Sequence, residues 1–186
     1  MRDEEIISLY FERDEHAIQA TIDTYGAYCS SIAMNILKNS SDAEETVADT
    51  WVSAWNSIPP QRPQFLRLFL GKITRNLSLS LWRSKTADCR GGGETAKALD
   101  ELSDCISDQN DPEKVVQTKE LGHIISVFLK SEPQNSRVIF LRRYFYLESS
   151  KAIALRLGTS DANVRMTLSR TRKRLKDHLK KEGYLV

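Results

Sequence analysis

The second half of the segment 149–181 carries the side chains with the clearest chemical capacity in this sequence. Arginine can donate two parallel hydrogen bonds to the edge of guanine, asparagine can form an equivalent pair with adenine, and further cations can hold phosphates. If the apolar residues of this segment turn inward, its outward positions are Asn163, Arg165, Met166, Ser169, Arg170, Arg172 and Lys173. This pattern predicts a helix that reads the bases of duplex DNA.

Two helices joined by a tight turn are needed to position that face. Ser149 can cap a first helix and Ser160 a second one, with Gly158 between them, where glycine tolerates left-handed backbone geometry. Ala154 is small enough to let the helices approach closely. The apolar positions that would turn inward are Ile153, Ala154, Leu157, Val164, Leu168 and Leu175. The segment predicts a helix-turn-helix, and a three-helix bundle with a solvated basic face is the alternative.

Residues suited to catalysis or metal binding are present but not grouped. His16, His123 and His178 are far apart and lack metal-ligand spacing. No G-x-S-x-G motif occurs, and the glycine run 91–93 lacks the G-K-[ST] ending of a phosphate loop. We therefore expect no enzymatic activity, no metal and no cofactor.

Composition points to a cytoplasmic protein with no membrane partner. The 186 residues contain no apolar run approaching 18, and the acidic start after Met1 does not resemble a secretory signal. Cys29, Cys89 and Cys105 are odd in number and far apart, so we expect reduced thiols.

The net charge of +2 conceals four blocks of alternating sign. Residues 1–58 have 3 Lys and Arg against 11 Asp and Glu, whereas residues 59–92 have 7 against 1. Residues 93–134 have 4 against 9, and residues 135–186 have 13 against 4, a net charge of +9. Two basic blocks indicate two separate contacts with a polyanion, and the acidic first block indicates a basic partner surface.

Apolar residues recur at steps of three and four along most of the chain, and sustained alternation is missing, which predicts an all-α fold. One helix begins at Ser41, where S-x-x-E has the form of a capping box, and ends before Pro59. Asp111 and Pro112 have the pattern of a helix start. The segment 86–111 has the composition of a flexible linker. We expect two small helical domains, residues 1–85 and 112–186, joined by this linker.

Three stretches together resemble the extracytoplasmic-function group of bacterial RNA polymerase sigma factors. Residues 42–55 (DAEETVADTWVSAW) resemble region 2.2 of these proteins, and residues 65–85 resemble regions 2.3 and 2.4. Residues 153–175 are similar to region 4.2. The order of these stretches, and a short linker in place of a third domain, match this group.

The resemblance implies partners and site residues. A helix of region 2.2 would dock on the β′ coiled coil of core RNA polymerase through Glu44, Glu45, Thr46, Asp49 and Trp51. The minus-ten element of promoter DNA would contact Asn56, Arg62, Arg67, Lys72, Arg75, Asn76 and Arg83. The loop 56–63 would capture a flipped base, whose unstacking a preformed pocket must offset.

The C-terminal domain would read the minus-thirty-five element and touch the polymerase β flap. The residues implied for this element are Ser160, Asn163, Arg165, Met166, Ser169, Arg170, Arg172 and Lys173. Many members of the group are held inactive by an anti-sigma factor, which is therefore a candidate partner. The alternative function is a stand-alone helix-turn-helix regulator whose N-terminal domain dimerises or receives a signal.

Overall fold

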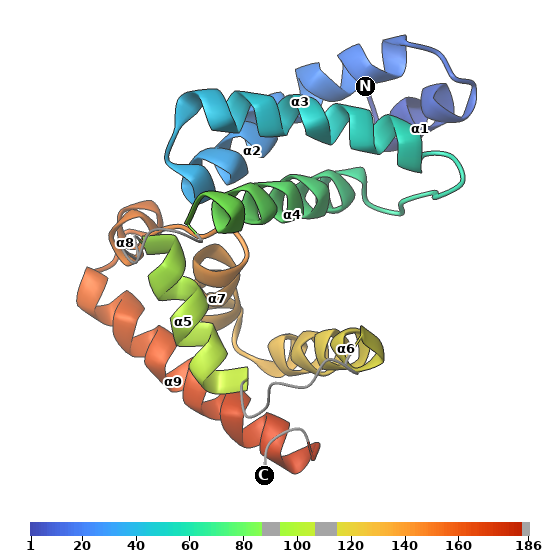
Figure 1. The fold of residues 1–186 in the computed structure, drawn as a ribbon. Coiled ribbons are helices and arrows are strands. Elements are labelled where there is room, and N and C mark those ends of the chain that lie inside the picture. The colour runs from blue at the N-terminus through green and yellow to red at the C-terminus, as the bar shows by residue number, and fades with distance from the viewer. Residues whose placement is uncertain (87–93, 107–114, 184–186) are drawn as a thin grey trace. The chain divides into compact units, whose positions relative to one another are not determined.

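The computed structural model describes residues 1–86, 94–106 and 115–183, and in these ranges the chain forms helices and no strands (Figure 1). The chain divides into two compact units, Met1–Gly91 and Gly92–Val186. The expected all-helical fold with two small domains is confirmed.

The first unit is built around three long helices that contact one another pairwise, with a short helix packed on one of them (Figure 1). They are α1 (Asp3–Phe11), α2 (His16–Leu37), α3 (Ser40–Ser57) and α4 (Leu66–Thr86). Apolar side chains at helical spacing meet between these helices, and their burial drives the packing. Buried members of this core include Ile6, Tyr10, Cys29, Ala33, Val47, Ala54, Ile58 and Leu70.

Helix α1, which the sequence analysis does not anticipate, connects two parts of the first unit. The Tyr10 hydroxyl lies 2.9 Å from the Thr21 hydroxyl in the core. Asp3 accepts a hydrogen bond from the Tyr25 hydroxyl and another, at 3.2 Å, from the backbone N–H of Leu66. The first N–H groups of a helix lack intrahelical acceptors, so Asp3 caps the start of α4 from a distant part of the chain.

The start of α3 differs from the sequence prediction. Asn39 is the N-cap, and its side-chain oxygen accepts a hydrogen bond from the backbone N–H of Asp42 at 3.0 Å. The predicted capping box at Ser41 is therefore wrong, because Ser41 already lies in the first turn. Asparagine is as good an N-cap as serine, so the sequence offers two possible N-cap residues, Asn39 and Ser41, two positions apart. The predicted end of this helix before Pro59 is confirmed.

Short polar side chains allow α3 and α4 to approach closely. The Thr50 hydroxyl donates to the Thr74 hydroxyl at 3.2 Å, and both side chains are fully buried. The nearby Cys29 is a free, buried thiol, as expected, and burial raises its pKa. Cys89 and the side chain of Cys105 lie outside the described residues.

The second unit packs its helices around the C-terminal one. These are α5 (Glu94–Ile106), α6 (Val115–Ser131), α7 (Gln134–Tyr144), α8 (Ser150–Leu157) and α9 (Asp161–Lys181), and α9 contacts each of the others. The buried apolar residues include Phe128, Ile139, Phe140, Leu147, Ile153, Val164, Leu168, Leu175 and Leu179. Arg174 of α9 binds Glu132 through two hydrogen bonds of 2.8 and 2.6 Å. The expected helix start at Asp111 and Pro112 lies outside the described residues.

Helix α5 lies inside the segment 86–111 that the sequence predicts to be a flexible linker, so the linker is not wholly irregular. α5 packs against α7 and α9 and belongs to the second unit. Its buried face consists of small residues, Thr95 and Ala98, which are 3% and 1% exposed. Small side chains give no strong apolar periodicity, which explains why the helix is missing from the prediction.

Candidate nucleic-acid interface

The helix-turn-helix predicted from the sequence is formed by α8 and α9. Ser149 caps α8 by accepting a hydrogen bond from the N–H of Ala152 at 3.2 Å, and Ser160 caps α9 by accepting one from Asn163 at 3.1 Å. Gly158 ends α8 with φ of 63°, a left-handed conformation that favours glycine. Both caps and the turn are therefore as predicted.

The inward face of this motif is also the predicted one. Ile153 and Val164 are fully buried, and Leu168 is 3% exposed. Thr171 is buried as well, and its hydroxyl donates a hydrogen bond to the backbone oxygen of Thr167 at 2.9 Å, so this buried donor has an acceptor. The burial of these residues fixes which side of α9 faces solvent.

The exposed side of α9 presents five of the predicted base-reading and phosphate-binding residues together. They are Arg165, Met166, Ser169, Arg170 and Lys173. Arg165 is linked to Asp161, one turn earlier, by an ion pair of 3.0 Å, while Met166 has 46% of its surface exposed. This face combines two guanidinium groups with a thioether and a hydroxyl, which suits contact with base edges and phosphates.

Two other predicted residues support the turn instead. The Ser160 hydroxyl oxygen is the N-cap acceptor of α9. The Asn163 side-chain amide donates to the Thr159 hydroxyl at 2.9 Å and is partly buried. In this conformation one of the two amide N–H donors of Asn163 is used within the turn, so only its second donor and its amide oxygen are left for a base.

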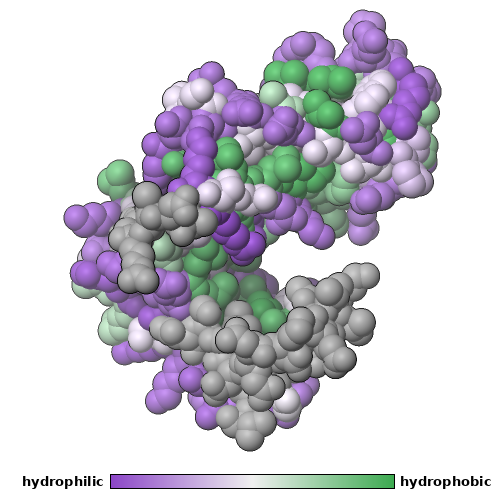
Figure 2. Space-filling view, viewed as in Figure 1, coloured by the Kyte–Doolittle hydropathy of each residue, from purple (hydrophilic) through white to green (hydrophobic). Residues whose placement is uncertain are grey.

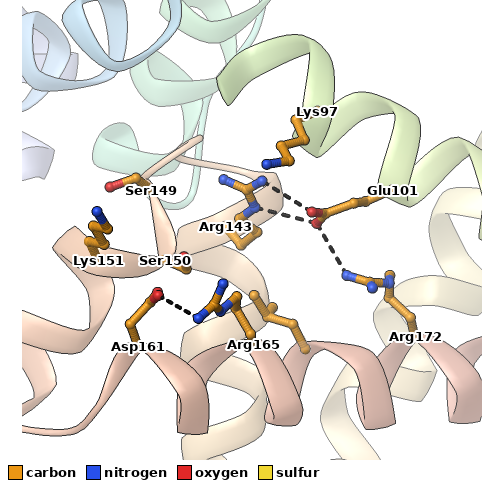
Figure 3. A pocket seen from close by; sticks show the side chains of 10 residues that line it. Lys97, Glu101, Arg143, Ser149, Ser150, Lys151, Asp161, Arg165 and Arg172 are labelled. Carbon is orange, nitrogen blue, oxygen red and sulfur yellow. Dashed lines mark hydrogen bonds and ion pairs between the residues drawn. The ribbon is translucent and has the colours of Figure 1, made fainter. Parts of the chain in front are cut away.

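Arg172 points to the flank of α9 that faces α5 (Figure 3). Its guanidinium donates to a Glu101 carboxylate oxygen at 3.1 Å and to the Tyr144 hydroxyl at 2.6 Å. Glu101 also pairs with Arg143, which is only 3% exposed, at 3.3 Å. Burial raises the pKa of Tyr144, so its hydroxyl stays protonated. Arg172 therefore belongs to a charge network that holds α5, and the network links residues 71 positions apart.

The predicted minus-ten residues lie mainly along α4. Lys72, Asn76 and Arg83 are exposed, and their spacing of four and seven places them on one stripe of the helix. Arg75 is half-buried beside this stripe, and burial, with a contribution from Arg83, lowers the pKa of its guanidinium. Cationic groups on one helix face can hold the phosphates of a DNA strand.

Three further predicted residues lie near the loop that precedes α4. Asn56 is exposed in the last turn of α3. The guanidinium of Arg62 lies 5.3 Å from the ring centre of Phe11, and that of Arg67 lies 4.6 Å from the ring centre of Tyr28. These stacking contacts orient both cations on the surface.

The predicted polymerase-binding residues divide by burial. Glu44, Glu45 and Asp49 are exposed on α3. Thr46 and Trp51 are 3% and 8% exposed, so they pack in the core and hold the helix in place. Val52, which was not among the predicted residues, is 59% exposed three residues beyond Asp49 and adds an apolar group to the acidic face.

Apolar surface also interrupts the polar surface of the first unit in Figure 2. Phe65 and Leu68, at the start of α4, are 58% and 56% exposed. Leu68 follows Arg67 directly, and Phe65 precedes it by two residues. An exposed aromatic ring is suited to stacking on an unpaired base.

Within the described residues, His, Cys, Asp and Glu form no group of three that could hold a metal ion. Over the same residues, none of the helices has the length and apolar character needed to span a membrane.

The fold and the exposed face of α9 define a class of protein: two all-helical units, the second with a basic helix-turn-helix. Residues 21–87 match the family model Sigma-70 region 2, and residues 133–175 match Sigma-70, region 4. The two matches occur in the order predicted and together cover more than half of the chain. This protein belongs to the extracytoplasmic-function (ECF) group of the sigma-70 family.

Two curated relatives are similar over most of this chain. One is the ECF RNA polymerase sigma factor SigE of Mycolicibacterium smegmatis, 27% identical over 153 residues, which are 82% of this chain and 57% of that protein. Another is the probable RNA polymerase sigma factor RfaY of Xanthomonas campestris pv. campestris, 27% identical over 151 residues, covering 81% and 37%. The chain thus spans about half the length or less of these relatives.

Proposed function

We propose that this chain binds core RNA polymerase and directs it to start transcription at particular promoters, with no enzymatic activity of its own. The observation that carries the proposal is the exposed face of α9, where Arg165, Met166, Ser169, Arg170 and Lys173 lie together. Family membership gives this face its target, since sigma factors are the promoter-recognition subunits of RNA polymerase.

In the second unit, α9 enters the major groove of the minus-thirty-five element. Arg170 can bind a guanine edge through two donors, whereas Lys173 is suited to a phosphate as a point charge. The net charge of +9 over residues 135–186 supports contact with DNA. The same unit touches the polymerase β flap.

In the first unit, the stripe of Lys72, Asn76 and Arg83 binds the sugar-phosphate backbone of the melted minus-ten strand. The loop 56–63 captures a flipped base, and the exposed Phe65 ring beside it offers a stacking surface. On α3, the carboxylates of Glu45 and Asp49 dock on the β′ coiled coil. These carboxylates are exposed and negatively charged, which supports docking on a basic partner surface.

Reconstituted transcription tests the proposal. The purified chain is mixed with core polymerase and fragments of the bacterial genome, and the transcripts are sequenced. We expect starts at promoters that core polymerase alone does not use, and these starts should share two sequence elements. Failure of the chain both to bind core polymerase and to produce such starts would refute the proposal.

Two variants separate base reading from phosphate binding. Arg170→Ala should cost about 1–3 kcal/mol and relax selectivity at one position of the minus-thirty-five element. Lys173→Ala, the matched control on the same exposed face, should weaken all sequences alike and reduce the salt dependence. Equal losses on every sequence for both variants would show that Arg170 contacts phosphate only.

The stand-alone regulator makes the opposite prediction about core polymerase. Such a protein would bind its operator tightly by itself, with a strong dependence on salt. Gel-shift assays with and without core polymerase distinguish the two functions. We expect selective binding only in the presence of core polymerase.

A further inference from the structure

A cavity of about 480 Å³ lies within the second unit, between α5 and the helix-turn-helix (Figure 3). Its walls come from α5, α7, the start of α8 and the N-terminal half of α9. Five cationic residues and two acidic residues line it. The surplus of positive charge makes an anion the natural occupant.

The two acids of this pocket are already paired. Glu101 binds Arg143 and Arg172, and Asp161 binds Arg165. The remaining cations are Lys97 of α5 and Lys151 of α8, both exposed. Among the described residues neither lysine has an ion pair or a hydrogen bond, so both ammonium groups are available to a ligand.

Hydrogen-bond donors of other kinds surround the same space. Ser149 and Ser150 line the pocket at the start of α8. The first N–H groups of a helix have no intrahelical acceptor, and the helix dipole favours an anion there. Ammonium groups, hydroxyls and backbone N–H groups together form the donor set that binds phosphate.

The position of the pocket indicates where such a phosphate would come from. Arg165 belongs both to the pocket and to the exposed face of α9 that is proposed to read bases. When the second helix of a helix-turn-helix enters the major groove, the first helix crosses the DNA backbone. A backbone phosphate of the bound duplex would therefore lie near the start of α8, whose residues Ser149, Ser150 and Lys151 line the pocket.

We propose that this pocket binds a phosphate of the promoter backbone, and that α5 is thereby part of the duplex-binding surface. Lys97 and Lys151 supply the charge, and the start of α8 supplies hydrogen bonds. The assignment rests on the proposed function, and it adds a DNA contact from the segment predicted to be a linker.

Glu101 acts as a positioning residue for this contact. It lies one helical turn after Lys97, so both side chains are on the same face of α5. Its carboxylate holds α5 against α7 and α9 through Arg143, Tyr144 and Arg172. Without that carboxylate the nearly buried Arg143 would lose its ion pair, and Lys97 would no longer be held at the pocket.

The test measures binding of promoter duplex to the holoenzyme across a series of salt concentrations. Lys97→Ala and Lys151→Ala should each weaken binding about threefold to tenfold on every promoter and lower the salt slope by about 1. Lys97→Arg should retain most of the affinity. Lys130→Ala, an exposed lysine of α6 in the same unit, is the matched control and should change little.

A double variant tests the role of Glu101. Glu101→Gln should weaken duplex binding, and adding Lys97→Ala should cause little further loss, because both changes remove the same contact. Tighter binding by Glu101→Gln would overturn the proposal, since α5 would then compete with DNA for Arg172. Circular dichroism of each variant verifies that the helices remain folded.

Other outcomes separate this proposal from the proposed function. If the wild-type holoenzyme selects promoters but Lys97→Ala and Lys151→Ala behave like Lys130→Ala, only the pocket assignment fails. If the wild-type chain selects no promoter, both fail. Inorganic pyrophosphate could raise the melting temperature of the wild-type free chain but not of Lys97→Ala, while Lys97→Ala binds promoter duplex as tightly as the wild type. In that case the ligand is a free phosphate compound, and the assignment to the DNA backbone is wrong.

Discussion

Replacing Gly71 by alanine tests the close packing between α2 and α4. A Cβ atom at this position would lie 2.4 Å from the Tyr28 hydroxyl oxygen and 3.1 and 3.2 Å from two carbons of the ring. The Arg67 guanidinium covers the same ring at 4.6 Å from its centre. The ring therefore cannot move away from α4 without disturbing a second contact.

Two opposing effects set the size of the change. Overpacking of a closely packed interface costs about 1–3 kcal/mol. Alanine is better than glycine inside a helix by about 0.8–1.0 kcal/mol, which offsets part of that cost. We expect Gly71→Ala to lower the free energy of unfolding of the first unit by a net amount of about 0–2 kcal/mol.

Urea unfolding followed by tryptophan fluorescence measures this change selectively. The three tryptophans are Trp51, Trp55 and Trp82, all in the first unit. Their emission therefore reports the unfolding of that unit even when the second unit unfolds separately. The midpoint should fall while the slope with urea stays constant.

Tyr28→Phe is the matched partner variant, because it removes the oxygen atom that the new Cβ would meet. In the Tyr28→Phe background, Gly71→Ala should cost at least 1 kcal/mol less than it does in the wild type. If the two changes are additive, or if Gly71→Ala alone stabilises the protein, the packing argument is wrong.

Three further predictions concern other parts of the molecule. Val164→Asp places an unpaired charge in the core of the second unit and should unfold that unit, as loss of its thermal transition would show. Burial and the neighbouring Asp3 raise the pKa of Tyr25 to about 12. The stability that the protonated Tyr25 hydroxyl contributes is therefore complete below pH 10 and is lost as the pH rises to about 12. Tyr25→Phe should reduce this alkaline loss of stability, as measured by urea titrations at several pH values. Asp49→Ala should weaken binding to core polymerase in a pull-down, whereas Glu12→Ala, also exposed on the first unit, should not.

Local patterns in the sequence were sufficient to predict the helix-turn-helix. Ser149, Gly158 and Ser160 each have a preferred place in helix capping, and Val164 and Leu168 have the spacing of one buried helix face. These signals depend on neighbouring residues only. The predicted caps and inward face were therefore correct.

Features that depend on residues distant in sequence were not predictable in the same way. Arg172 has the type and spacing of a DNA-binding residue, yet Glu101 of another helix holds it. Trp51 was predicted at an interface, but it is only 8% exposed and belongs to the apolar core of the first unit. The helix α5 was missed because Thr95 and Ala98 are too small to signal a buried face.

The hydrogen bond that the backbone N–H of Leu66 donates to Asp3 spans 63 positions of the chain and has a practical consequence for anyone who prepares this protein. An affinity tag that displaces the first residues would remove an acceptor from the opening turn of α4. That turn would fray, and the loop before it would lose its anchor. Such a preparation could fail in promoter melting even though every side chain proposed to touch DNA is unchanged.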